Sequence, residues 1–463
     1  MMERDPKKRI QIVHSRQNEL ADSSPPWSEH VSTYSYYEKE AGKKVIHEKD
    51  VDLGKLFPKD VLNACYSPVV KKDEKLTILL LAWEYPPHLI GGLGKHVYGL
   101  SLGLQRLGYK VCVITANPGY LEDGEMAEGV HIYRVQSRSE KDSDFFTWVA
   151  GLNVAIAERV LQLARKHHFS VLHAHDWLVG ESAIFIQTIL SLPLISTIHA
   201  TEYGRNKGIH TELQRYIHEK EQKLVMTSDH LIVCSEYMNK ELIKIFEVSD
   251  KRIAIIPNGI EADLFLESNG NLLSAMPLQE NKHLIFSIGR IVQEKGFDTL
   301  IEAAFLMKDR FPDVYFIIAG KGPMLEEYRR RVRQLKLKNL FFVGFISEDI
   351  KNALFKICTL AVFPSRYEPF GIVALEAMMH GKPTIVSRTG GLKSIIQHGV
   401  TGLLMAPGDA SSFIRLASRL LENEKDAGRM GINGKAMVEK NFSWKKIAED
   451  TIRVYEEIVE LKV

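Results

Sequence analysis

The sequence predicts an α/β protein made of two doubly wound domains, each a parallel sheet with helices on both faces. Short apolar runs alternate with amphipathic segments from Leu76 onward, and the same rhythm starts again after residue 280. Strand and helix in this order favour parallel sheets, because the helical crossovers cover both faces of each sheet. A chain of 463 residues is too long for one core. It suits two domains of roughly 200 residues each, plus extra segments.

Six apolar runs are expected as buried strands in each domain. Those of the first domain are LTILLLAW (76–83), YKVCVITA (109–116), FSVLHAH (169–175), LPLISTIH (192–199), HLIVCS (230–235) and RIAIIPNG (252–259). Those of the second are KHLIFSIGR (282–290), VYFIIAGKG (314–322), NLFFVGF (339–345), TLAVFPS (359–365), PTIVSRTGG (383–391) and TGLLMAPGD (401–409). Ligands of doubly wound folds bind outside the carboxyl ends of the strands, so the loops that follow these runs should carry the chemistry.

The predicted domain boundaries follow changes in composition. Residues 1–74 are polar and mixed in charge, without a sustained period of 2 or 3.6, so we expect an appendage that is partly disordered. The first α/β domain is expected over residues 75–257 and the second over residues 258–446. Two such domains facing each other would enclose a cleft between them.

Composition and charge argue against several kinds of partner. Apolar residues make up 45% and charged residues 25% of the chain, as in an ordinary soluble globular protein. The formal net charge of +2 gives no reason to expect nucleic acid or an anionic membrane as a partner. The 4 cysteines are far apart, as in a reducing compartment. No apolar run approaches the ~18 residues that cross a bilayer, so we expect a cytoplasmic protein without stable membrane insertion.

A glycine-rich turn lies between the first predicted strand and a helix. Pro86 and Pro87 lead into Gly91, Gly92 and Gly94, and an amphipathic helix follows. Glycines at such a turn let backbone amides approach an anion, and the helix N-terminus adds partial positive charge. The alternative is a tight strand-to-helix turn without a ligand, since the motif is neither a Walker loop nor GxGxxG.

Two cations follow the first predicted strand of the second domain. Arg290 and Lys295 lie in the segment IGRIVQEKG, five residues apart. Together they can neutralise a diphosphate, Arg290 through its planar guanidinium and Lys295 as a point charge. Taken alone, such a pair is more often solvated on the surface.

The segment RYEPFGIVALEAMMHGKP contains two acids eight residues apart with mostly apolar residues between them. Glu368 stands in a Glu-Pro-Phe-Gly turn, and the first backbone amides after it, at Phe370, Gly371 and Ile372, suit a phosphate. Glu376 lies just over one turn inside the helix that follows, where its carboxylate can bridge two ribose hydroxyls. The alternative is that the acids only complement the helix dipole and face solvent.

Together these motifs resemble the retaining GT-B glycosyltransferases of family 4. The resemblance depends on the glycine loop, the pair Arg290 and Lys295, and the two acids spaced as E-x7-E, and it covers residues 76–460. HAHDWLVGESA (173–183) and STIHATEYGR (196–205) are similar to the bacterial glycogen synthase branch, whose members extend α-1,4-glucan from a nucleotide-glucose. The resemblance implies the GT-B fold, in which two Rossmann-like domains enclose an interdomain cleft.

The resemblance also implies roles for particular residues. His199 would face the donor sugar, Glu368 would hold hydroxyls of the transferred sugar, and Asp176 would lie near the acceptor. Donor-binding positions would be Gly91, Gly92, Gly94, Arg290, Lys295, Phe370, Gly371, Ile372 and Glu376. Without the family, His199 would more often be a structural residue and Asp176 only a helix cap. Residues 447–463 would cross back to the N-terminal domain, as the last helix of the family does.

The function expected from this resemblance is transfer of α-glucose from ADP-glucose or UDP-glucose to an α-1,4-glucan or oligosaccharide. Nucleotide-sugar and glucan are the expected partners, and neither cofactor nor metal is expected. The sequence has no HExxH motif and no cysteine cluster. Asp142-Ser143-Asp144 matches a metal-binding DxD pattern, but it lies in a charged stretch away from the end of any predicted strand.

One departure from the glycogen synthase pattern keeps other functions open. Bacterial glycogen synthases usually have a lysine just before the glycine loop, whereas this chain has His88-Leu89-Ile90 there and Lys95 after the loop. The alternatives are a family 4 transferase that makes a glycolipid or a disaccharide, a non-transferase GT-B enzyme such as a nucleotide-sugar epimerase, and a catalytically silent glucan-binding protein.

Overall fold

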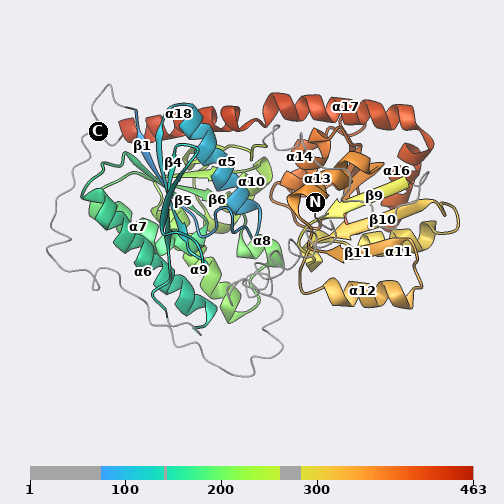
Figure 1. Cartoon of the computed structure of the whole chain (residues 1–463), viewed down its shortest axis with the longest axis horizontal. Coiled ribbons are helices and arrows are strands. Elements are labelled where there is room, and N and C mark those ends of the chain that lie inside the picture. The colour runs from blue at the N-terminus through green and yellow to red at the C-terminus, as the bar shows by residue number, and fades with distance from the viewer. Residues whose placement is uncertain (1–74, 140–142, 261–282, 462–463) are drawn as a thin grey trace, which may run out of the picture.

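The computed structural model describes residues 75–139, 143–260 and 283–461. Within them, two sheets lie side by side along the long axis of the molecule, and helices cover both (Figure 1). The prediction of two doubly wound α/β domains is confirmed. The predicted appendage, residues 1–74, lies outside the described residues.

The first sheet has 8 strands in the order β3-β4-β2-β1-β5-β6-β7-β8. Its strands are β1 (Thr77–Leu81), β2 (Lys110–Ala116), β3 (Gly124–Ala127), β4 (Val130–Val135), β5 (Val171–His175), β6 (Leu194–Ile198), β7 (His230–Val233) and β8 (Ile253–Ile255). All neighbours pair in parallel except β3 with β4. β3 and β4 were not predicted, because β3 is an exposed edge strand and β4 alternates buried with exposed residues.

Six α-helices accompany the first sheet in the described part of the chain. They are α5 (Gly92–Arg106), α6 (Phe145–Ala164), α7 (Gly180–Leu190), α8 (Glu202–Asn206), α9 (Glu212–Thr227) and α10 (Glu236–Phe246). Asp144, Thr211 and Ser235 cap the first turns of α6, α9 and α10 with side-chain oxygens. Asp144 of the DxD-like stretch is therefore a helix cap, while Asp142 lies outside the described residues.

The second sheet has 6 strands in the order β11-β10-β9-β12-β13-β14, and all of them are parallel. They are β9 (His283–Ile288), β10 (Val314–Ala319), β11 (Leu340–Gly344), β12 (Leu360–Phe363), β13 (Thr384–Ser387) and β14 (Leu403–Met405). Each corresponds to one of the apolar runs predicted for this domain. The helices that accompany it are α11 (Asp298–Met307), α12 (Leu325–Gln334), α13 (Glu348–Ile357), α14 (Ile372–Met379), α15 (Leu392–Ile395), α16 (Ala410–Glu422) and α17 (Glu424–Asn441).

The last helix, α18 (Trp444–Glu460), leaves the second sheet and packs against α5 beside the first (Figure 1). The fit is close, because a Cβ atom on Gly99 would come within 1.9 Å of the Trp444 ring. Further along, the Tyr455 hydroxyl lies 2.6 Å from Nδ1 of the buried His173. α17 and α18 thus tie the two sheets together outside the linker between β8 and β9.

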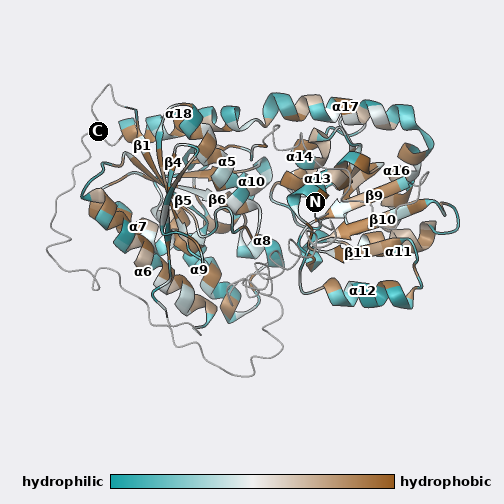
Figure 2. Ribbon diagram, viewed as in Figure 1, coloured by the Kyte–Doolittle hydropathy of each residue, from teal (hydrophilic) through white to brown (hydrophobic). Residues whose placement is uncertain are grey.

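Hydrophobic residues concentrate in the strands of both sheets, whereas α12 is mainly hydrophilic (Figure 2). The strands of the first sheet are almost fully buried at β1, β2, β5 and β6. Such continuous burial is typical of parallel strands covered on both faces. Among the described residues, no helix combines the length and apolar composition that a membrane span requires.

Candidate active site

The predicted site residues lie in loops and helices that follow the strands of the two sheets, where the two domains touch. Ser235 Oγ donates to the Pro369 carbonyl at 2.7 Å. Tyr367 Oη donates to Glu241 Oε1 at 3.0 Å and accepts from the Thr201 amide at 3.4 Å. The loop that contains Glu368 is therefore held against the first domain on both sides of that residue.

Glu368 and Lys295 form an ion pair beside the second sheet. Lys295 Nζ donates to Glu368 Oε2 at 2.5 Å, and Ser365 Oγ donates to the same oxygen at 3.1 Å. Only 10% of the Glu368 side chain is exposed. The structure thus brings together the cation that follows β9 and the acid that follows β12, although 73 residues separate them in sequence.

A glycine pair that the sequence analysis did not single out supports the Glu368 turn. The Gly391 amide donates to the Glu368 carbonyl at 2.9 Å. A Cβ atom on Gly390, whose φ is +49°, would lie 1.9 Å from that carbonyl oxygen. Only glycine allows this close approach of two backbone segments. The signal in the sequence was the Gly-Gly dipeptide at the end of the run PTIVSRTGG.

The N-terminus of α14 lies next to this turn. The helix begins at Ile372 after Gly371, whose φ of +109° is in the region that favours glycine, and no side chain caps its first amides. Uncapped amides at a helix N-terminus are donors for an anion, and the helix dipole adds positive charge there. Gly92 approaches the same point from the first domain, because its Cβ would lie 3.3 Å from Ile372 Cδ1.

The Glu84 carboxylate accepts hydrogen bonds from several amides of the predicted glycine loop. The donors are the amides of Ile90 at 2.6 Å, Gly91 at 3.0 Å and Gly94 at 2.8 Å. Burial raises the pKa of the Glu84 carboxyl, whereas these bonds and the charge of Arg290 oppose the rise. Any contact between this loop and a phosphate is therefore limited to the amides that Glu84 leaves free. Glu84 was not among the predicted site residues, although it is an acid that closely follows the buried strand β1.

Arg290 follows β9, and its charge acts on Glu84 of the first domain. Its guanidinium lies 3.4 Å from Glu294 Oε1, and 37% of its side chain is exposed. The Lys295 side chain is 20% exposed. Both cations are thus partly accessible, which a residue that binds a ligand requires.

Glu376 belongs to a cluster of four charges, Lys95, Glu348, Lys351 and Glu376, which we call the cross-domain charge cluster. Glu376 Oε1 accepts from Lys351 Nζ at 2.8 Å and from Lys95 Nζ at 3.1 Å. Burial would raise the pKa of the Glu376 carboxyl, but the charges of Lys351 and Lys95 lower it to about 2. Oε2 is buried without a partner. The alternative of a solvated Glu376 is wrong, since the residue is buried.

Asp176 holds the backbone of His199. The His199 amide donates to Asp176 Oδ1 at 2.7 Å. Asp176 stands between β5 and η1 (Trp177–Val179) and has a φ of +60°, which is uncommon for residues other than glycine. Burial raises the pKa of the Asp176 carboxyl to about 6. The alternative of a cap for the helix after it is wrong, because Asp176 makes no side-chain capping bond to η1.

His199 joins a group of three imidazoles with His96 and His175. His175 Nδ1 lies 3.2 Å from His199 Nε2. His96 Nδ1 donates to Asn258 Oδ1 at 2.7 Å, so His96 Nε2 is its acceptor nitrogen. Burial lowers the pKa of His199 to about 3 and the pKa of His96 and His175 well below their usual value. All three rings are therefore neutral at pH 7.

The same three histidines are a possible set of metal ligands, and the sequence analysis did not find them. Their candidate ligand nitrogens lie within 4.8 Å of one another. Nitrogens that share a tetrahedral zinc ion at 2.0–2.1 Å lie roughly 3.4 Å apart, so the rings would have to move closer to bind one. His96 and His175 come from α5 and β5, elements that only the folded sheet brings together. That no metal takes part stays a prediction.

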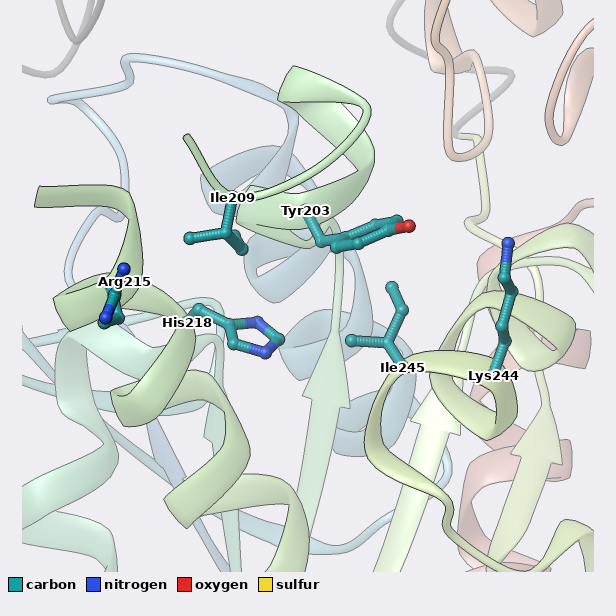
Figure 3. A pocket seen from close by; sticks show the side chains of 6 residues that line it. All are labelled: Tyr203, Ile209, Arg215, His218, Lys244 and Ile245. Atoms are coloured by element: carbon teal, nitrogen blue, oxygen red, sulfur yellow. The ribbon is translucent and has the colours of Figure 1, made fainter. Parts of the chain in front are cut away.

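A partly open pocket of about 530 Å³ lies among α8, α9 and α10 of the first domain. Figure 3 shows the ring of Tyr203 and the imidazole of His218 facing this space, with Lys244 on one side and Arg215 on the other. Tyr203 follows His199 by four residues. The residues that line the pocket include none of the predicted site residues: they are Tyr203, Ile209, Arg215, His218, Lys244 and Ile245.

The uncapped N-terminus of α14, the Lys295–Glu368 pair and the buried Glu376 all lie close to the contact between the two α/β domains. Two family models match the chain: Glycosyltransferase Family 4 over residues 90–264 and Glycosyl transferases group 1 over residues 272–437. The chain belongs to the group 1 glycosyl transferases of family 4 and is a glycosyltransferase.

Relatives along most of the chain support this membership. An uncharacterized glycosyltransferase of Methanocaldococcus jannaschii is 33% identical over 393 residues, which are 83% of this chain and 99% of that protein. The glycogen synthase of Mycobacterium tuberculosis is 33% identical over 398 residues, which are 82% of this chain and 94% of that protein.

Solved structures share the fold at lower identity. Sucrose-phosphate synthase of Thermosynechococcus elongatus has a TM-score of 0.73 at 23% identity and covers 84% of this chain and 100% of its own. The catalytic domain of starch synthase IV from Arabidopsis thaliana, bound to ADP and acarbose, has a TM-score of 0.69 at 17% identity, with coverage of 84% and 100%.

Proposed function

We propose that the protein is a retaining glucosyltransferase that moves α-glucose from ADP-glucose or UDP-glucose to an α-1,4-glucan or oligosaccharide. The observation that carries the proposal is the Lys295–Glu368 pair beside the uncapped N-terminus of α14. This arrangement offers positive charge for a diphosphate and a carboxylate for sugar hydroxyls at one place. The 33% identity with the glycogen synthase of Mycobacterium tuberculosis supports the choice of donor and acceptor.

The main electrostatic task is to stabilise the charge that develops on the leaving nucleoside diphosphate. Arg290, Lys295 and the first amides of α14 would do this by fixed charges and dipoles, without a metal or cofactor. Glu376 would accept a ribose hydroxyl at Oε2, the oxygen that the two lysines leave free. Its pKa of about 2 keeps it ionised at neutral pH.

The sugar would lie between Glu368 and His199. The Glu368 carboxylate accepts bonds from sugar hydroxyls and holds the ring as positive charge builds on the anomeric carbon. His199 is a neutral imidazole, so it can donate or accept a hydrogen bond without adding a positive charge beside the reacting centre. Asp176, through the His199 amide, is a positioning residue in this scheme and does not reach the sugar itself. Retention follows if the acceptor attacks the face that the nucleotide leaves.

The test is a nucleotide-release assay with ADP-glucose and with UDP-glucose, each with and without glycogen or maltooligosaccharide. Release of ADP or UDP that depends on glucan, together with a lengthened glucan product, is the expected result. Equal release with and without every acceptor would refute transfer and indicate hydrolysis or epimerisation. Glu368→Gln serves as the matched inactive control, because it keeps the shape of the side chain and removes the charge.

The pocket lined by Tyr203 favours a second candidate, transfer to a small anionic sugar with a disaccharide as product. Arg215 and Lys244 are basic, the ring of Tyr203 offers an apolar face for a sugar, and the lining contains no acid. The same assay with a hexose phosphate as acceptor separates the two candidates. If a hexose phosphate stimulates nucleotide release and glucan does not, the acceptor is the small sugar and not the glucan.

We also propose a cytoplasmic location. Three cysteines of the described chain, Cys112, Cys234 and Cys358, are free and buried, which agrees with a reducing compartment. Nucleotide sugars of the proposed kind would have to be available there. Fractionation of cells that express the protein is the direct measurement, and recovery with an extracellular fraction would contradict the proposal.

A further inference from the structure

Lys95 connects the two domains at the proposed donor site. It lies in the first turn of α5, directly after the glycine loop of the first domain. Its ammonium donates to Glu348 Oε1 at 2.9 Å and to Glu376 Oε1 at 3.1 Å. Both acids belong to the second domain, where Glu348 begins α13 and Glu376 lies in α14. The Lys95 side chain therefore spans the contact between the domains.

The contact fixes Oε1 of Glu376 and leaves Oε2 without a partner. Lys351, which is only 3% exposed, donates to Oε1 from within the second domain, and Lys95 donates to the same atom from the first. Oε2 has no partner and is buried. Two donors on one oxygen restrict rotation of the carboxylate. If the domains separate, Lys95 leaves and only Lys351 orients the acid.

Charge in the cluster favours the bridged arrangement. Burial alone would lower the pKa of the Lys95 ammonium, but the charges of Glu376 and Glu348 raise it above its usual value. Lys95 is 32% exposed and Glu376 is 6% exposed. A pair as buried as this is screened by solvent far less than a surface ion pair.

We propose that Lys95 is a positioning residue that couples binding of the donor nucleotide to closure of the two domains. The inference rests on the proposed function, because it needs Glu376 to hold the ribose. A nucleotide that binds the oriented Glu376 favours the closed state, and by reciprocity the closed state binds the nucleotide more tightly. Lys95 supplies this link because only in the closed state does it hold Glu376.

Glu348 binds both lysines of the cross-domain charge cluster and does not contact the proposed ligand. It is 65% exposed, and its two oxygens accept from Lys95 and Lys351 separately. It therefore holds the two lysines next to each other, with Glu376 between them. A variant at Glu348 perturbs the bridge while leaving every proposed donor contact in place.

The experiment is calorimetric titration of the full-length protein with ADP and with UDP. Lys95→Met is expected to weaken nucleotide binding about tenfold, within the range usual for coupling between sites. Turnover at saturating donor should fall less than the affinity, and Lys95→Arg should restore part of the loss. Glu348→Gln should weaken binding in the same direction. The double variant should be no weaker than Lys95→Met, because both changes break one bridge.

Arg106→Met is the matched control. Arg106 lies in the last turn of the same helix and pairs with Glu128 of its own domain at 3.9 Å, so its removal leaves the domain contact intact. Small-angle X-ray scattering with saturating nucleotide provides a readout that a local structural role would not change. Lys95→Met should give a larger radius of gyration than the wild type, whereas Arg106→Met should not.

Different failures identify which idea is wrong. If Glu376→Ala weakens nucleotide binding but Lys95→Met and Glu348→Gln bind as the wild type does, the coupling is refuted and the donor site stands. If the wild type binds neither nucleotide, the proposed function is refuted and the coupling falls with it. If Glu376→Ala binds as well as the wild type, Glu376 does not hold the ribose, and the coupling is refuted while the proposed function stands. Should Lys95→Met not fold, Glu348→Gln decides alone, since it alters an exposed side chain.

Discussion

Replacing Asp176 by asparagine tests the raised pKa of the Asp176 carboxyl, which accepts a hydrogen bond from the His199 amide. Burial raises the pKa of the Asp176 carboxyl from an ordinary value of 3.8 to about 6. The folded state therefore binds this proton more tightly than the unfolded state does between pH 4 and pH 6. Stability falls as the pH rises through this window, because the folded protein must keep a buried carboxylate that the unfolded chain would hydrate.

The pKa change sets the size of the effect. Each pKa unit corresponds to about 1.4 kcal/mol, so the difference between the two states is worth about 3 kcal/mol above pH 6. Asparagine keeps an oxygen that accepts from the His199 amide but does not titrate. The free energy of unfolding of Asp176→Asn, relative to the wild type, should therefore rise by up to about 3 kcal/mol from pH 4 to pH 7.

Urea denaturation at half-unit steps from pH 4 to pH 8 measures this difference, and subtraction of the two curves removes titration of all other groups. Asp409→Asn is the control, since Asp409 is an exposed cap of α16 whose amide replacement still caps the helix. Catalysis provides a second readout. If ionised Asp176 holds His199 in place, kcat/KM of the wild type should fall as the pH drops below about 6. The kcat/KM of Asp176→Asn should not show this decrease. Parallel unfolding curves for wild type and variant would refute the reasoning.

Three further predictions follow from the contacts around Glu368. Lys295→Ala removes the cation 2.5 Å from Glu368 and should slow nucleotide release about 10²-fold, and a rate near that of the wild type would contradict the proposed charge stabilisation. Gly390→Ala puts a Cβ atom 1.9 Å from the Glu368 carbonyl, so steady-state assays should show a loss of activity while circular dichroism shows the fold retained. Tyr367→Phe removes the hydroxyl that donates to Glu241 and should lower the free energy of unfolding by about 1 kcal/mol in urea titration; an unchanged value would mean that water replaces the bond.

The strands could be predicted where burial leaves a continuous apolar run. All six runs of the second domain and six strands of the first were found in this way. β3 and β4 were missed for physical reasons: β3 is an exposed antiparallel edge, and β4 alternates buried with exposed residues, so neither has such a run. The helix caps at Thr211 and Ser235 also depend on local chemistry, because each side chain accepts a hydrogen bond from an amide three residues further along the chain.

The candidate site could be predicted only in part. Lys295, Glu368 and Glu376 were predicted for the site because each stands after a strand or in the following helix, where doubly wound folds bind ligands. Their pairing could not be predicted. No local sequence pattern indicates that Lys295 pairs with Glu368, because 73 residues separate them along the chain. Nor does one indicate that the Glu84 carboxylate accepts from the amides of the glycine loop.

The sequence by itself determined the alternation of strand and helix, the membership of family 4, and the residue types of the candidate site. Those properties depend on local hydrophobic pattern and on motifs that short segments contain. Only the tertiary structure decided which side chains meet: Lys95 with Glu376 across the two domains, and His96 of α5 with His175 and His199, which come from other segments. The physical reason is that burial and proximity, which set the pKa of each group and the partner of each charge, exist only once the two sheets have folded and touched.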